Sequence, residues 1–90
     1  MDGGYFRVRY RKRPVVVTAE RFWSRLRPWP TGVCDCDKHP RHGPHLHLSE
    51  GGATQVFEGD WVITEERGLL RFFSRIDHDT FTAEYEVLEA

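Results

Sequence analysis

Cysteine is scarce in this chain of 90 residues, and the two that are present, Cys34 and Cys36, stand one residue apart. A disulfide between them would close almost no loop and would stabilise the fold little, so we expect reduced thiols, which suit a cytosolic setting. Long apolar runs are also missing. There is no stretch of eighteen apolar residues and no charged leader before an apolar segment, so we expect neither a membrane span nor secretion.

Patterns typical of enzymes are missing as well. No Ser-His-Asp arrangement, phosphate-binding glycine loop or paired carboxylates at a catalytic spacing stand out. His78 lies between Asp77 and Asp79, which is more typical of a surface turn than of a general base. We therefore expect a protein that is not an enzyme.

Charge is balanced overall but divided along the chain. The net charge is −1, yet residues 1–48 carry ten Lys or Arg against four Asp or Glu, and residues 49–90 carry three against ten. The two halves could present opposed surfaces to partners, or they could pair with each other within one small fold. We favour the second interpretation, because we expect strands from both halves to share a sheet.

The hydrophobic pattern predicts one mainly β domain over residues 1–90, a small antiparallel barrel or curled sheet with at most one or two helical turns. Gly51-Gly52 and Gly68 predict hairpin turns, and Asp77 or Asp79 could cap a helical turn around Thr80 and Phe81. The alternating or β-branched segments that we expect to form strands are Tyr5–Arg11, Val15–Phe22, Leu46–Leu48, Thr54–Phe57, Asp60–Thr64, Leu69–Phe73 and Glu84–Leu88.

Residues 34–47 hold both cysteines and four of the five histidines, the ligand types of a closed tetrahedral zinc site. Residues i and i+2 of a strand point to the same side, so two extended pairs can converge across a hairpin. This predicts structural zinc within an insertion at about residues 33–48, held by Cys34, Cys36, His45 and His47. His39 or His42 could replace either imidazole, because a loop imposes no facing rule.

Two other interpretations of this segment remain open. The spacing matches no standard zinc finger, so the segment could be a solvated histidine-rich loop. A catalytic zinc would need three protein ligands, an open position and a base such as Glu50 or Asp35. We favour a closed structural site.

A basic stripe near the start could contact phosphates and stack on bases, because its cations are interleaved with Tyr5, Phe6 and Tyr10. The stripe comprises Arg7, Arg9, Arg11, Lys12 and Arg13. The alternative is a solvated strand face with the aromatic side chains in the core. A zinc-stabilised nucleic-acid-binding module is therefore our second interpretation of function.

Three motifs resemble those of a widespread family of small phage and prophage proteins. Residues 10–19 are similar to its opening Y-R-K-K/R-P-V-V-I/V-x-A, residues 59–64 to its G-D-W-I-I segment, and residues 81–86 to its closing F-x-x-T-Y-E. The resemblance covers most of the chain. Between Gly68 and Phe81 the chain departs from the family, because the usual E-F-Y-P-C-K-P-D is replaced by a longer segment without Pro-Cys.

The resemblance implies a phage origin, whereas most of the family has no assigned activity. Zinc-containing inhibitors of type II CRISPR nucleases are similar in size and character, so our leading expectation is an anti-CRISPR protein. It would act in the bacterial host cytoplasm by binding an RNA-guided DNA nuclease and blocking guide or target-DNA loading. The acidic residues expected to meet the basic channel of the nuclease are Glu50, Glu58, Asp60, Glu65, Glu66, Asp77 and Asp79.

Overall fold

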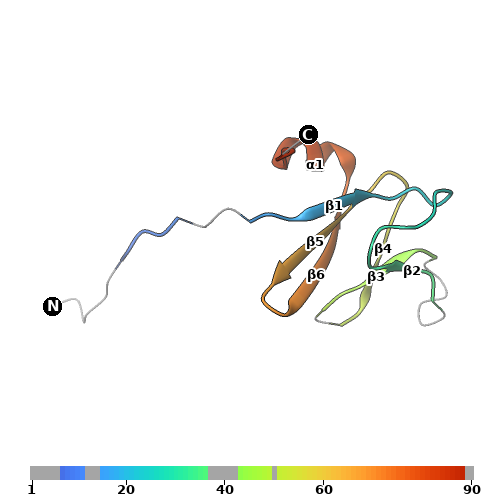
Figure 1. The fold of residues 1–90 in the computed structure, drawn as a ribbon, viewed down its shortest axis with the longest axis horizontal. Coiled ribbons are helices and arrows are strands. Elements are labelled where there is room, and N and C mark those ends of the chain that lie inside the picture. The colour runs from blue at the N-terminus through green and yellow to red at the C-terminus, as the bar shows by residue number, and fades with distance from the viewer. Residues whose placement is uncertain (1–6, 12–14, 37–42, 50, 89–90) are drawn as a thin grey trace.

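A computed structural model describes residues 7–11, 15–36, 43–49 and 51–88. These residues form two small antiparallel sheets and one short helix (Figure 1). The mainly β prediction is confirmed. Of its two alternatives the curled sheet is the one observed, because the described strands form two separate three-stranded sheets and no closed barrel.

The first sheet combines one strand from the basic half of the chain with a hairpin from the acidic half. Its order is β1 (Thr18–Arg21), β5 (Trp61–Arg67) and β6 (Leu70–Ile76). Gly68, with a φ of 60°, turns the chain between β5 and β6. The predicted strands over residues 60–64 and 69–73 are therefore present, and each is longer than the sequence pattern indicated.

The second sheet contains three short strands in chain order, β2 (Val33–Cys34), β3 (His45–His47) and β4 (Ala53–Gln55). The predicted turn between β3 and β4 is present, and Gly51 and Gly52 adopt φ values of 104° and 81° that favour glycine.

The core lies between the two sheets and is small. Its buried side chains are Phe22, Leu46, Val56 and Val62. Trp29, Val33 and Phe73 pack against this cluster from partly exposed positions. Residues from both halves of the chain thus share one core.

The helix α1 (His78–Glu84) follows β6 and is capped by Asp77, whose carboxylate accepts a hydrogen bond of 3.1 Å from the Thr80 N–H. The predicted cap at Asp77 is confirmed. The strand predicted over Glu84–Leu88 is wrong, since Glu84 ends the helix and residues 85–88 pair with no strand in the described part of the chain. No helix among the described residues is long and apolar enough to cross a membrane.

The strand predicted over Tyr5–Arg11 is also wrong where it can be followed. Residues 7–11 are not in a strand and extend away from the two sheets (Figure 1). Tyr10, which one of our two interpretations placed in the core, is 88% exposed, and Val8 is 61% exposed. Tyr5 and Phe6 lie outside the described residues.

Candidate metal centre

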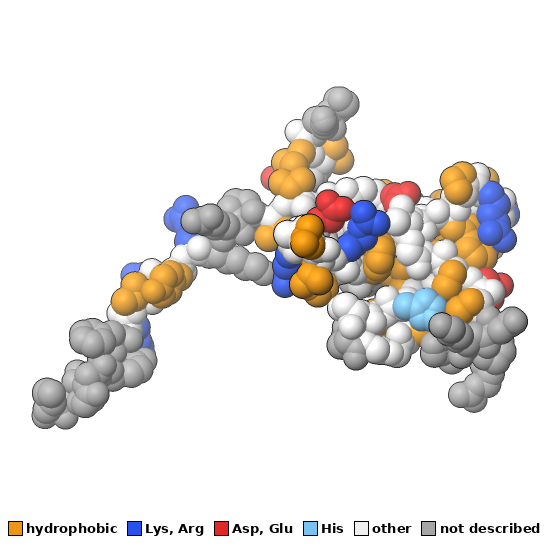
Figure 2. All heavy atoms as spheres, turned by 60° about the horizontal axis from the view of Figure 1, so that its bottom comes forward, with side chains coloured by type: hydrophobic (Ala, Val, Ile, Leu, Met, Phe, Trp, Pro, Cys, Tyr) orange, Lys and Arg blue, Asp and Glu red, His pale blue; other side chains and the backbone are white. Residues whose placement is uncertain are grey.

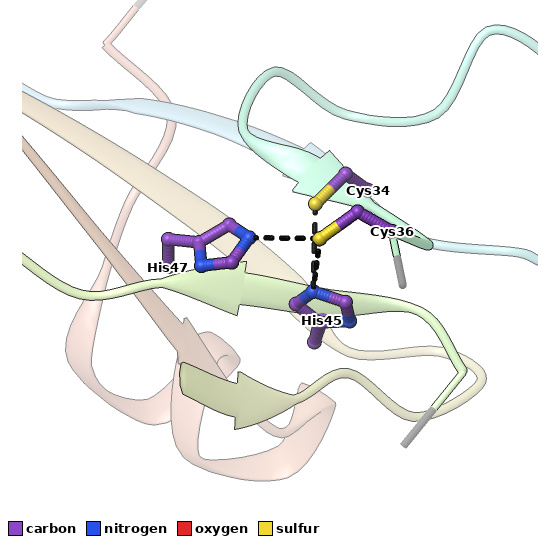
Figure 3. Close-up of side chains that lie close together, drawn as sticks. All are labelled: Cys34, Cys36, His45 and His47. Carbon is purple, nitrogen blue, oxygen red and sulfur yellow. Dashed lines mark hydrogen bonds between the residues drawn. The ribbon is translucent and has the colours of Figure 1, made fainter. Parts of the chain in front are cut away.

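The second sheet brings together the four residues that the sequence singled out. Cys34 ends β2 and lies directly opposite His45 in β3, so their side chains share a face of the sheet. Cys36 is two residues after Cys34, and His47 is two residues after His45, so in an extended chain their side chains point to that same face. Figure 3 shows the four side chains pointing toward one another from the two sides of the hairpin.

The donor atoms of this group form a compact cluster. The His45 Nε2 lies 3.5 Å from the Cys34 Sγ and 3.4 Å from the Cys36 Sγ. The His47 Nε2 lies 3.3 Å from the Cys36 Sγ, and all four donor atoms fall within 4.8 Å of one another. The two cysteines are not joined by a disulfide. This Cys2His2 group could hold a metal ion.

The backbone orients the central imidazole for such a role. The His45 Nδ1–H donates a hydrogen bond of 2.6 Å to the Gly43 carbonyl, so Nε2 keeps its lone pair toward the cysteines. This hydrogen bond is the main cause that raises the pKa of His45 above its ordinary value, while burial opposes it. This role of Gly43 could not be predicted from the sequence, because every residue type carries the same backbone carbonyl acceptor.

The ligands differ in burial in a way that fits a site at the edge of the core. His45 is fully buried, Cys34 and Cys36 are half-buried, and His47 is exposed. Burial is also the largest cause that raises the pKa of the Cys34 thiol. His39 and His42, the alternative imidazoles, lie outside the described residues.

The acidic residues expected to meet a partner do not form one free surface. Asp60 is a correction to that expectation, since it is 4% exposed and its carboxylate accepts hydrogen bonds of 2.6 and 3.1 Å from Arg75. It also accepts from the Phe57 N–H at 2.8 Å, so it organises the turn before β5. The sequence pattern missed this ion pair because its partners are fifteen residues apart.

Most of the other acidic side chains have partners within the chain. Glu65 and Glu66 form ion pairs with Arg67 and Arg71. Glu58 accepts hydrogen bonds from the backbone and hydroxyl of Ser24, which lower the pKa of its carboxyl group. Asp77 caps α1 and Asp79 is exposed in its first turn, while Glu50 lies outside the described residues.

No protein-family model matches the chain, and neither a curated protein nor a solved structure is similar to it at a significant level.

Proposed function

We propose that this protein is a non-enzymatic binding domain held together by a structural zinc ion. The observation that carries the proposal is the convergence of two thiols and two imidazoles on one point between β2 and β3. Two sulfur and two nitrogen donors favour zinc among the common divalent ions. Four protein ligands complete a tetrahedron and leave no position for a reactive water, which supports a structural role.

The spacing of the donor atoms fits that ion. In a tetrahedral site with zinc–sulfur bonds of about 2.3 Å and zinc–nitrogen bonds of about 2.0 Å, sulfur and nitrogen ligands lie about 3.5 Å apart. Three of the four sulfur–nitrogen separations, at 3.3, 3.4 and 3.5 Å, are close to this value. No two of the four donor atoms are more than 4.8 Å apart, so they need to move only slightly toward one another to bind the ion.

Metal analysis of the purified protein after extensive dialysis tests this proposal. We expect one equivalent of zinc per chain, and cobalt substitution should give the absorption of a tetrahedral ion with two thiolate ligands. Cys36→Ser should lose both signals, whereas Asp35→Asn, which changes the residue between the cysteines, should keep them. Less than half an equivalent of zinc in the unaltered protein would contradict the proposal.

The partner that we propose is a host RNA-guided DNA nuclease of type II, as for an anti-CRISPR protein of phage origin. The support comes from the resemblance to phage proteins and from the acidic second half of the sequence. Burial of Asp60 and the internal ion pairs of Glu65 and Glu66 reduce the acidic area, so Glu58, Asp77 and Asp79 carry the proposed contact.

A pull-down with the purified nuclease, followed by a DNA-cleavage assay, tests the proposed partner. We expect a stable complex and inhibited cleavage, and we expect Asp79→Lys to weaken both. Leu69→Ser, at the exposed tip of the β5–β6 hairpin, is a control that should weaken neither. No complex and full cleavage at a large excess of this protein would contradict the proposed partner, although the zinc proposal would stand.

Nucleic-acid binding is a second candidate, favoured by the exposure of Arg7, Arg9 and Arg11. None of these side chains has an ion pair within the described part of the chain. This candidate predicts retention on DNA that falls steeply with salt, and its loss when all three are changed to Ala. Arg67→Ala is the matched control, because Arg67 is already paired with Glu65. Retention that is unchanged by the triple substitution would contradict this role.

A further inference from the structure

The outer edge of β1 is open to a further strand. β1 pairs with β5 on one side, where Ala19 lies opposite Ile63, and no described strand lies on the other side. An edge of this kind presents backbone donors and acceptors to any extended segment that lies along it.

One face of this edge is apolar and hollow. A cavity of about 500 Å³ lies between β1 and the region of α1, which Figure 1 places beside β1. Its apolar lining includes Val17, Ala19, Trp61, Phe81, Tyr85 and Val87. Within this lining the Trp61 ring of β5 stacks on the Phe81 ring of α1, with 4.1 Å between the ring centres. The cavity can therefore accept apolar side chains from a strand added to β1.

The opposite face of the same edge is polar and acidic. Thr18 and Glu20 alternate with Val17 and Ala19, so they point to the other side of the sheet. There they line a hollow together with Thr64, Glu66 and Arg71. Because Arg71 is already paired with Glu66 at 3.1 Å, Glu20 gives this face an excess of negative charge.

Residues 7–11 have the complementary pattern. In Arg-Val-Arg-Tyr-Arg, Val8 and Tyr10 fall on one side of an extended chain and the three arginines on the other. The segment projects from the body and carries hydrophobic and basic side chains in solvent (Figures 1 and 2). Its alternation is that of a strand, yet Val8 and Tyr10 are 61% and 88% exposed.

We propose that residues 7–11 of one copy add antiparallel to the outer edge of β1 in a second copy, and that the exchange is reciprocal. The register that places Arg9 opposite Glu20 also places Tyr10 opposite Ala19, over the apolar cavity. A shift by one residue would direct the arginines into the cavity and the apolar side chains onto the acidic face. Two-fold symmetry makes both arms equivalent.

The geometry of the chain favours a second copy over the same copy. For Arg9 to reach Glu20 within one chain, the backbone would have to reverse between residues 11 and 18. Instead, residues 15–17 run directly into β1 and their side chains line the hollow beside it (Figure 1). A partner copy supplies the arm without that reversal.

Sedimentation of the full, metal-loaded chain over a range of concentrations tests the exchange. We expect a concentration-dependent dimer. Arg9→Glu and Glu20→Arg should each raise the dimer dissociation constant about tenfold, because each dimer contains the pair twice. Tyr10→Ser should also weaken the dimer, while Leu69→Ser, which changes a fully exposed leucine far from the edge, should not.

Mixing the two charge-reversed variants gives the sharpest result. A heterodimer of R9E with E20R places opposite charges at both exchanged edges, so native mass spectrometry should show it forming in preference to either homodimer. The R9E/E20R double variant should recover the dissociation constant of the unaltered chain. A monomer at every concentration, a dimer indifferent to these substitutions, or recovery in the double variant without a heterodimer on mixing would each overturn the proposal. The last outcome would place the arm on its own chain.

Discussion

At the scale of single residues, neighbouring positions in β3 serve two different purposes. Leu46 is fully buried in the core, and it lies opposite Val33 on one face of the hairpin. His45 and His47 lie on the other face with the cysteines. The candidate metal centre and the core therefore lie on the two sides of the same short hairpin, so we expect a substitution on one side to change the stability of the other.

This alternation explains why the candidate ligands could be predicted from the sequence. The Cys-x-Cys and His-x-His spacings have the period of a strand, and the hairpin brings both pairs to one point. The buried pair of Asp60 and Arg75 could not be predicted in the same way. It depends on how β5 and β6 pair, with Val62 opposite Arg75, and not on a local spacing.

Asp60→Asn tests the buried ion pair. The substitution keeps an acceptor for the Phe57 N–H but removes the charge that pairs with Arg75. We expect a loss of about 2 kcal/mol in the free energy of unfolding at neutral pH, measured with urea. Glu66→Gln, in the exposed pair with Arg71, should cost no more than about 0.5 kcal/mol. Equal effects of the two substitutions would contradict the structural role of Asp60.

Gly32→Ala tests the close approach of the two sheets. Gly32 has a φ of 95°, and a Cβ at this position would lie 2.8 Å from the Phe73 ring. We expect a loss of about 2–3 kcal/mol from backbone strain and overpacking together.

The control for this substitution is Gly68→Ala. Gly68 also has a positive φ, of 60°, but a Cβ there would meet nothing within 4 Å. Gly68→Ala should lower the free energy of unfolding by only about 1 kcal/mol, because only the strain of the left-handed backbone conformation opposes it. If both substitutions destabilise the protein equally, the proposed clash of a Cβ at position 32 with the Phe73 ring is contradicted.

At the scale of elements, strands were predicted well where a neighbouring strand was available. The β5–β6 hairpin has such a neighbour along its whole length, because its register runs from Trp61 opposite Ile76 to Arg67 opposite Leu70. Residues 7–11 and 84–88 alternate just as clearly but pair with no described strand. Alternation of polar and apolar residues shows that a segment suits a position between solvent and an apolar surface. The segment forms a strand only when the fold offers it the edge of a neighbouring strand.

The cap of α1 helps to explain why the predicted strand over residues 84–88 does not form, because it favours a helix in the segment just before it. Asp77 accepts hydrogen bonds from the backbone and hydroxyl of Thr80, which lower the pKa of its carboxyl group below the ordinary value of 3.8. Because the folded-state pKa is the lower one, this stabilisation is present above pH 3.8 and is lost as the pH falls through the lowered pKa.

An NMR titration tests the cap at Asp77. The Thr80 amide resonance should move with a midpoint below pH 3.8 in the unaltered protein. In Asp77→Asn the cap keeps its acceptor but this titration should disappear, whereas Asp79→Asn should leave it in place. A midpoint at or above the ordinary value in the unaltered protein would show that the carboxylate does not cap the helix.

At the scale of the whole molecule, the two charged halves of the sequence are joined by strand pairing more than by ion pairs. β1 from the basic half pairs with β5 from the acidic half. The ion pairs found among the described residues, in contrast, all lie within the acidic half. Three arginines of the basic half, Arg21, Arg25 and Arg27, instead lie over tryptophan rings. The closest is Arg27, which lies 3.8 Å from the centre of the Trp29 ring. The expectation that the halves share a sheet is confirmed.

Metal removal tests how far the small core depends on the centre. The hairpin of β2 and β3 contributes Val33 and Leu46 to a core in which Phe22 and Val62 belong to the first sheet and its flank. Without an ion, the buried His45 and the two thiols would be held together only by weak hydrogen bonds between sulfur and imidazole. We expect a strong chelator to lower the melting temperature by more than about 10 °C in a single cooperative transition.

Cys36→Ser should reproduce the effect of the chelator, and Asp35→Asn should not. Circular dichroism and tryptophan fluorescence should report the same midpoint, because Trp29 packs on the shared core. If the chelator melts only the second sheet while amide protection in β5 and β6 persists, the first sheet is stable by itself. The ion would then stabilise only the second sheet, and the two sheets would be separate folding units instead of the two halves of one core.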